Sequence, residues 1–296
     1  MNRESKQNNS NNDNDNIISP SNLNHEQFSI TPLKLKNDKK VSYFVQNGSP
    51  IYAETPWVRA PFGISGFQPK GSLSLEWSIN LSAVGDDSSI DEKEKAETNA
   101  WFEQWVHADE MMIDHGVANS KLIFGKEYKP SQRDVVAALF APVVKGKDTA
   151  YPIRVQPKIM KMTKQDPNDK AKFITLHDEP NILVCMEGSA EELTITSFKQ
   201  LEKLVPKNGY VKAIVQPKTW YVAGKFGLLL NVLQLLVRKK TGGRPTGYAF
   251  GVPLVPASTS APTLKVKDST DKTEDNNHEE QVDSDEEQGE EVVEEE

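Results

Sequence analysis

Residues 210–222 (YVKAIVQPKTWYV) and 225–240 (KFGLLLNVLQLLVRKK) are two long apolar stretches joined by Ala223-Gly224. A short linker containing glycine between stretches rich in β-branched and aromatic residues predicts a long β-hairpin. Apolar residues lie on both faces of the second arm: Phe226, Leu228, Leu230 and Val232 on one, and Leu229, Leu233 and Leu235 mostly on the other. A strand covered on both faces is central in its sheet, so we expect the fold to be built around this arm.

Alternation of apolar and polar residues is the main pattern elsewhere in the chain. In residues 72–81 the apolar positions are Leu73, Leu75, Trp77, Ile79 and Leu81, each followed by a polar residue or preceded by one. A period of two predicts a strand with one buried face. Shorter strands are predicted at residues 28–36, 40–46, 153–162, 173–177 and 182–186.

One long helix interrupts the predicted strands. Ser89 and Glu92 have the spacing of a capping box, and Gly116 is the expected stop. Between them, Trp101, Trp105, Ala108 and Met112 form one apolar stripe at helical spacing. Shorter helices are predicted at residues 131–140 and 196–205. Five or more strands with one inserted helix favour a small β-barrel, closed or partly open, over a parallel α/β sheet.

The charge of the chain is divided unevenly along its length. The whole chain of 296 residues has a net charge of −8. Residues 268–296 contain 15 acidic residues and one lysine, whereas residues 116–267 contain 24 Lys and Arg against 11 Asp and Glu. We therefore expect a disordered Asn-rich N-terminus at 1–27, one folded domain at 28–256 and a disordered acidic tail at 257–296. A basic body with a separate acidic tail favours a partner that is nucleic acid or a basic protein.

Several classes of protein are disfavoured by the composition. No apolar run reaches 18 residues and the N-terminus has no secretory apolar region, so we expect an intracellular protein without a membrane span. The single cysteine, Cys185, excludes an internal disulfide, and its apolar neighbours predict a core position. The basic segment 238–245 lacks the spacing of a phosphate-binding loop.

The polar face of the long helix is the strongest candidate for catalysis or metal binding. Glu103, His107, Glu110 and Asp114 share this face at helical spacing. It lies opposite the tryptophan stripe, where solvent is expected, and no second His or Cys cluster supports it. We therefore interpret it as a solvated face, and the sequence predicts no enzyme, cofactor or metal site.

Basic residues interleaved with aromatic ones are the most informative pattern for function. Such residues suit single-stranded nucleic acid, because aromatic rings stack on bases while lysines follow the phosphates. The alternative is that the tryptophans, Trp57, Trp77 and Trp220 among them, are core residues and that the lysines only solvate a sheet. The candidate DNA-binding residues are Arg59, Lys70, Arg154, Lys158, Lys161, Lys212, Lys218, Trp220, Tyr221, Lys225 and Arg238.

Three segments resemble the phage-type single-stranded DNA-binding proteins of T-odd phages and large nucleocytoplasmic DNA viruses. They are residues 140–145 (FAPVVK) with 151–158 (YPIRVQPK), residues 211–216 (VKAIVQ) with 220–227 (WYVAGKFG), and the acidic C-terminus. The second is similar to the family's Trp-x-x-x-Gly-Lys-Phe-Gly hairpin. The chain ends in Glu294, Glu295 and Glu296, whereas the phage proteins end in an aromatic residue.

The resemblance implies a mainly β fold, an OB-fold-like five-stranded barrel with an inserted long α-helix. It also implies single-stranded DNA binding, largely without sequence preference, in viral DNA replication, recombination or repair. The acidic tail would bind a polymerase, helicase or primase, and a homodimer is left open. The tail residues concerned are Asp283, Asp285, Glu286, Glu287, Glu290, Glu291, Glu294, Glu295 and Glu296. The implied location is the host cytoplasm or a viral replication factory, with packaging in the virion left open. The competing hypothesis is a protein-interaction module or chaperone-like factor whose tail binds basic partners.

Overall fold

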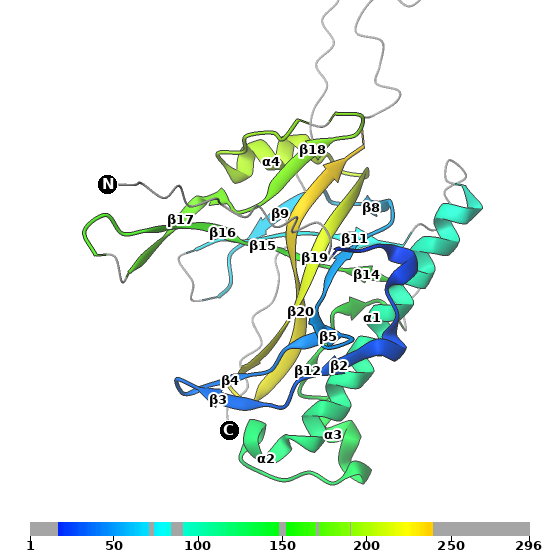
Figure 1. Ribbon diagram of the computed structural model, residues 1–296, viewed down its shortest axis with the longest axis vertical. Helices are drawn as coiled ribbons and strands as arrows, with labels where there is room; N and C mark the ends of the chain where they lie inside the picture. Colours follow the sequence, from blue (N-terminus) through cyan, green and yellow to red (C-terminus); the bar gives the residue numbers. More distant parts are fainter. Residues whose placement is uncertain are drawn as a thin grey trace, which may run out of the picture. The chain divides into compact units, whose positions relative to one another are not determined.

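The computed structural model describes residues 17–70, 74–83, 91–147, 152–169, 172–189 and 191–238. Its centre is the hairpin of β19 (Gly209–Val222) and β20 (Lys225–Val237), which runs through the main sheet (Figure 1). The two arms pair from Val211 with Val237 to Val222 with Lys225. The linker residues Ala223 and Gly224 have φ of +50° and +74°, the left-handed geometry of a tight two-residue turn. The predicted hairpin is confirmed.

The main sheet follows the strand order β13-β14-β11-β8-β19-β20-β15-β10-β9. Strands β1, β7, β12 and β18 join it beside this path, and the last two pair in parallel with β20. The strands besides the hairpin are β1 (Ile17–Ile18), β7 (Tyr52–Glu54), β8 (Val58–Ala60), β9 (Ile64–Phe67), β10 (Glu76–Ile79), β11 (Leu81–Ser82), β12 (Phe140–Ala141), β13 (Val144–Lys145), β14 (Arg154–Val155), β15 (Lys158–Ile159) and β18 (Leu183–Met186).

In the described part of the chain, three smaller sheets accompany the main one. They are β2 (Phe28–Ile30), β5 (Phe44–Gln46) and β6 (Ser49–Pro50); the hairpin of β3 (Lys34–Lys36) and β4 (Lys39–Val41); and the hairpin of β16 (Lys161–Gln165) and β17 (Phe173–Pro180). All five shorter strand predictions therefore fall on strands, although several are divided into two or three pieces.

The predicted five-stranded barrel is not confirmed. The mainly β fold with one long helix is present, but the strand path stays open between β13 and β9 in the part of the chain that the structure describes. The predicted strand at residues 72–81 shows one reason: it divides at Asn80 into β10 and β11. β10 pairs with β9 and β15, while β11 pairs with β8 and β14, so one apolar repeat serves two parts of the sheet.

A bulge in β20 changes which leucines face the core. Val215 pairs with Val232 but Ile214 pairs with Gln234, so Leu233 has no partner across the hairpin. Beyond the bulge, Leu235 returns to the buried side with Phe226, Leu228 and Leu230. The prediction that grouped Leu235 with Leu229 and Leu233 was wrong, because an extra residue reverses the alternation.

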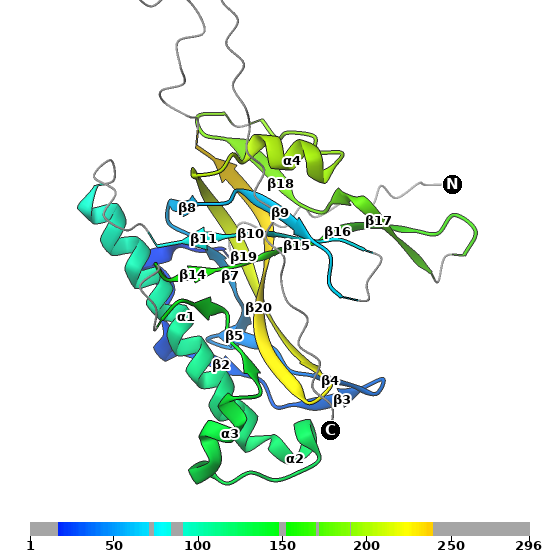
Figure 2. The same cartoon turned by 180° about the vertical axis from the view of Figure 1, so that it is seen from behind.

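The long helix α1 (Glu92–Ala118) lies beside the strands of the main sheet (Figures 1 and 2). Its residues Trp101, Trp105, Ala108 and Met112 are buried in the core, as predicted. Its two ends differ from the prediction. The N-cap is Asp91, whose carboxylate accepts the backbone N–H of Lys93 at 2.8 Å, and Ser89 lies outside the described residues. The helix continues past Gly116, where an added Cβ would lie 2.4 Å from the Phe226 ring. Close packing, not helix termination, requires this glycine.

The other helices are short. They are α2 (Ser120–Phe124), α3 (Arg133–Ala137) and α4 (Phe198–Leu204), with 3₁₀ turns η2 (Pro20–Asn22), η3 (His25–Gln27) and η4 (Pro130–Gln132). The predicted helix at 131–140 ends early because Phe140 pairs in β12 with Phe226. The polar face of α1 is exposed as predicted, and Arg133 pairs with Glu110 and Asp114 on it at 2.7 and 2.6 Å.

Two predictions about buried positions need correction. Residues 17–27 are folded, since β1 pairs with β7 and Leu23 is buried, so the predicted disorder up to residue 27 is wrong for this stretch. The two isoleucines of β1 supply the apolar surface that the Asn-rich residues before them lack. Cys185 is half-buried, not in the core, because its parallel pairing with Leu236 turns its neighbour Val184 inward instead. Residues 1–16 and 257–296 lie outside the described residues.

Candidate nucleic-acid interface

Two adjoining cavities of about 390 and 310 Å³ lie over β9, β10, β15 and β20. They share Glu76, Trp77 and Lys158, so we treat them as one feature and call it the groove. Besides these three, the groove is lined by Phe67, Ser74, Ser78, Ala141, Pro142, Val143, Lys145, Gln156, Ile159, Met160, Lys161, Thr163, Thr175, Leu228, Leu229 and Leu230.

Cations line the groove and are held in place by neighbouring side chains. Lys158 pairs with Glu76 at 2.7 Å, and Lys161 donates to the hydroxyl of Ser74. Lys145 donates to the side-chain oxygen of Gln156 at 3.1 Å. These bonds restrict the rotamers of long side chains, so part of the entropy cost of holding a ligand is already met.

A like-charge pair occupies one corner of the groove. Lys145 and Arg154 are opposite each other across β13 and β14. Burial, and secondly the charge of Arg154, lower the pKa of Lys145. Like charges directly opposite each other on paired strands are destabilising, and an anion bound between them would remove that penalty. Arg59 lies on the same face, since Ser82 pairs with both Arg59 and Arg154.

The floor of the groove continues onto the β19–β20 hairpin. Leu229 lines the groove and lies opposite Lys218 in the hairpin. Trp220 lies opposite Gly227, where an added Cβ would be 2.8 Å from the indole nitrogen and 2.7 Å from the Ala141 carbonyl oxygen. The glycine therefore lets the half-buried Trp220 ring lie close to the hairpin, beside a residue of the groove wall.

The wall of the groove is fixed by a buried acid on α1. The carboxylate of Asp109, 1% exposed, accepts the backbone N–H groups of Val143 and Val144 at 2.9 and 3.0 Å. Burial raises the pKa of this carboxyl to about 6, against the lowering effect of these two bonds and of Lys147. Asp109 thus positions the segment that carries Lys145. The sequence offers one sign of this buried acid: Asp109 directly follows Ala108, which belongs to the apolar stripe of α1.

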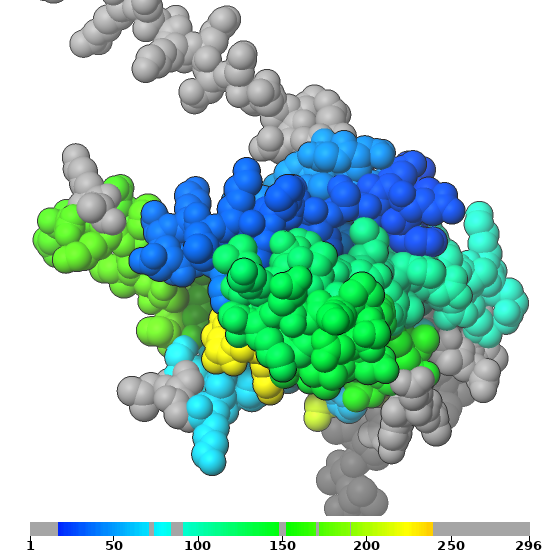
Figure 3. Space-filling model, turned by 90° about the horizontal axis from the view of Figure 1, so that it is seen from below, coloured from blue at the N-terminus to red at the C-terminus, as the bar shows by residue number. Residues whose placement is uncertain are grey.

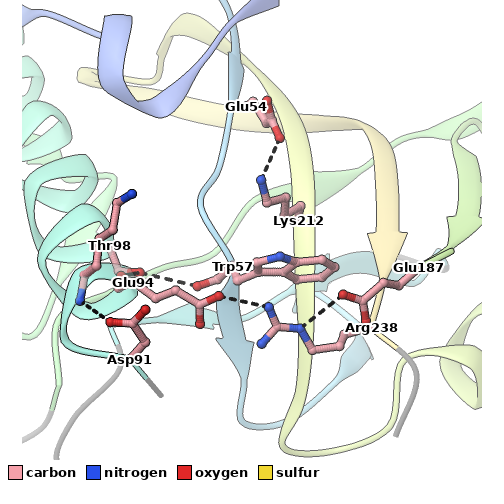
Figure 4. A network of polar contacts seen from close by, with 9 residues as sticks. Glu54, Trp57, Asp91, Glu94, Thr98, Glu187, Lys212 and Arg238 are labelled. Carbon is pink, nitrogen blue, oxygen red and sulfur yellow. Dashed lines mark hydrogen bonds and ion pairs between the residues drawn. The ribbon is translucent and has the colours of Figure 1, made fainter.

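Two predicted residues belong to a separate cluster around Trp57, shown in Figure 4. The guanidinium of Arg238 lies 4.2 Å from the Trp57 ring centroid and pairs with Glu94 at 3.1 Å and Glu187 at 3.7 Å. Lys212 pairs with Glu54 at 3.1 Å on the other side of the ring. The charges of Lys212 and Arg238 are therefore matched by carboxylates outside the groove.

The remaining candidates lie at the margins or face away. Lys70 is exposed in a turn, Lys225 is exposed at the start of β20, and Arg59 donates to the Asn208 side chain at 2.8 Å. Tyr221 alternates with Trp220 on β19 and packs against the core, with its hydroxyl 2.8 Å from that of Ser42. Burial raises the pKa of Tyr221.

Of the predicted residues, Lys158 and Lys161 thus line the groove and Arg154 lies opposite its Lys145. Lys218 and Trp220 lie beside it on the hairpin. Lys145 and Phe67, 56% exposed in the groove, were absent from the predicted site. Phe173, at 69% the most exposed large apolar residue in the described ranges, was also absent from the predicted site. It lies on the same face of β17 as Thr175, which lines the groove. No helix in the described ranges is long and apolar enough to cross a membrane.

Comparisons with known proteins were made by sequence and by structure. No protein-family model matches the chain, and no curated protein matches it. Among solved structures, the chain is similar to the single-stranded DNA-binding protein from bacteriophage Enc34 in complex with ssDNA. That match has 14% identity and a TM-score of 0.34, covering 74% of this chain and 99% of the other.

The chain is also similar to gp2.5, a single-stranded DNA-binding protein encoded by bacteriophage T7. Here the identity is 11% and the TM-score is 0.38, covering 68% of this chain and 96% of the other.

Proposed function

We propose that this protein binds single-stranded DNA in the groove, largely without sequence preference. The observation that carries the proposal is that Lys145, Lys158 and Lys161 line a groove together with the exposed ring of Phe67, and that Arg154 lies opposite Lys145. Lysines and arginine would hold the phosphates, and Phe67 and Trp220 would stack on bases. Stacking does not depend on base identity, so little sequence preference is expected.

The role that we propose is in viral DNA replication, recombination or repair. The similarity of residues 140–158 and 211–227 to the phage-type proteins supports it. The acidic tail, residues 268–296, would occupy the basic surface weakly until DNA displaces it. The freed tail would then bind a basic patch on a polymerase, helicase or primase. Formation of a homodimer belongs to the same proposal.

The second candidate is a protein-interaction module or chaperone-like factor, and the acidic tail favours it. The two candidates differ in which part of the chain holds the partner: the body in the first and the tail in the second. Only the first gives the folded body its own affinity for DNA.

Titration of fluorescent oligo(dT) with the full chain and with a chain lacking 268–296, at two salt concentrations, tests the proposal. We expect the full chain to bind and the shortened chain to bind more tightly, most clearly at low salt, where charges are least screened. A shortened chain that does not bind oligo(dT) but a full chain that binds basic proteins would contradict the proposal and favour the second candidate.

A further inference from the structure

A second basic surface lies away from the groove, at the end of the molecule where the β19–β20 hairpin turns. Lys34, Lys36 and Lys39 of the β3–β4 hairpin, Lys121 and Lys126 at α2, and Lys225 at the turn are all exposed there. In Figure 3 the blue hairpin, the green helices and the yellow turn lie side by side. Lys40 Nζ donates to the Ile123 carbonyl at 2.6 Å, and the Phe124 and Phe226 rings are 5.7 Å apart, so these elements are in contact. We call this surface the basic end.

The lysines of the basic end differ from those of the groove in their partners. Within the described ranges, none of these six lysines pairs with a carboxylate, although Asp38 and Glu127 lie in the same segments. Lys36 and Lys39 even oppose each other across β3 and β4. Like charges at such a position destabilise the hairpin, so the pairing of β3 with β4 does not explain this arrangement. A polyanion bound here would stabilise it.

An open cavity of about 630 Å³ separates the basic end from the groove. Tyr43 and Lys218 both line it, and the Tyr43 ring is 61% exposed. The backbone N–H of Tyr43 donates to Thr31 at 2.8 Å, so the chain is fixed while the ring remains free to stack. Tyr43 follows β4 of the basic end by two residues and lines the cavity together with Lys218. An exposed aromatic ring near lysines is the arrangement that binds bases and phosphates together, whereas an acidic peptide needs no aromatic platform.

The cavity and the groove meet on the hairpin. Lys218 lines the cavity, and its cross-strand neighbour Leu229 lines the groove. A strand leaving the groove can therefore pass over Leu229 and Lys218 and reach Tyr43 without crossing an acidic side chain of the hairpin. We infer that the basic end is the second half of the single-stranded DNA path, with Tyr43 stacking a base and the lysines of β3 and β4 holding phosphates.

This inference rests on the proposed function, but it can be wrong while the proposed function is right. A series of oligo(dT) lengths from about 4 to 30 nucleotides, which spans the usual site sizes, tests it. The full chain is compared with Tyr43→Ala and with the double variant Lys36→Glu, Lys39→Glu. Matched controls are Val135→Ala on α3, 48% exposed, and the double variant Lys199→Glu, Lys203→Glu on α4.

We expect Tyr43→Ala to weaken binding of long oligonucleotides by about 5- to 150-fold and to leave the shortest bound lengths unchanged. The double lysine variant should follow the same length dependence, and the controls should not. No loss at any length, or an equal loss at every length, would overturn the inference while the proposed function stands. Tighter binding of long oligonucleotides by the double lysine variant would overturn it in favour of the acidic tail as the occupant.

Discussion

The groove and the basic end each contain a like-charge pair across two strands, but they differ in how their lysines are held. In the groove, Lys158 is paired with Glu76 and Lys145 with Gln156. At the basic end, Lys36 and Lys39 face each other with no acid partner in the described ranges. Both lysines of the groove are oriented in advance, and Lys158 also shares its charge with a carboxylate. Unpaired cations keep their full charge but are not oriented.

We infer from this difference that the groove and the basic end contribute to DNA binding in different ways. The groove would fix the position of the strand through oriented cations and stacking rings. The basic end would add electrostatic affinity that depends strongly on salt and little on geometry.

The largest expected effect is that of salt on the full chain. If about eight phosphates are held by the two surfaces together, each lowers the slope of log affinity against log salt by about 0.7. Raising monovalent salt from about 50 to 200 mM should then weaken binding by about 10³-fold. Titration by fluorescence anisotropy measures this slope. A flat response would contradict both surfaces.

The next effect concerns Trp220, whose ring lies beside the groove wall. Trp220→Ala should weaken binding at all oligonucleotide lengths by about 5- to 150-fold, the value of one stacked base. The loss of affinity is compared with that of Phe173→Ala, which removes an exposed ring on the β16–β17 hairpin instead of the β19–β20 hairpin. A folded Trp220→Ala chain with unchanged affinity would show that this ring only packs against Gly227.

The buried Asp109 should give the groove wall a distinct pH dependence. Its folded-state pKa of about 6 lies above its ordinary value of 3.8, so the folded chain holds this proton more tightly. The stability that this group contributes is therefore greatest below about pH 4 and falls by up to about 3 kcal/mol as the pH rises through 6.

Replacement of Asp109 by Asn removes the titration while keeping the shape of the side chain. The difference in unfolding free energy between pH 4.5 and pH 7, measured with urea, should be smaller in Asp109→Asn than in the wild type. Parallel stability profiles for the two proteins would show that Asp109 does not titrate in this range.

The smallest effect separates paired from unpaired cations directly. Glu76→Gln frees Lys158 from its ion pair at the centre of the groove. Exposed ion pairs contribute about 1 kcal/mol or less, so DNA binding should tighten by only about 2- to 5-fold. In contrast, the double variant Lys36→Glu, Lys39→Glu at the basic end should weaken the binding of long oligonucleotides. Weaker binding by Glu76→Gln would mean that orientation by Glu76 matters more than the charge it neutralises.

The parts of the fold predicted best are those set by local sequence. The β19–β20 hairpin and the stripe from Trp101 to Met112 depend on turn chemistry and periodicity, which a single sequence contains. The open strand path, the bulge at Leu233 and the packing of Gly116 on Phe226 depend on residues far apart in the chain. No local pattern contains that information.

The same reasoning explains which site residues were predicted. Lys158 and Lys161 are three residues apart in one stretch, and both line the groove. Lys212 and Arg238 look equally basic in sequence, but Glu54 and Glu94 reach them from distant segments. Lys145 is placed by Asp109 through the adjoining Val144, a contact between helix and strand that spacing does not reveal.

Photocrosslinking tests the central claim most directly, because it reports where the strand lies. Full chain is bound to a long oligonucleotide containing 5-iodo-deoxyuridine, irradiated and digested, and the crosslinked peptides are identified by mass spectrometry. The account predicts crosslinks to the peptides that contain Phe67, Trp220 and Tyr43, with the last lost when the oligonucleotide is shortened. Crosslinks confined to the exposed face of α1, or to the Trp57 cluster, would contradict it.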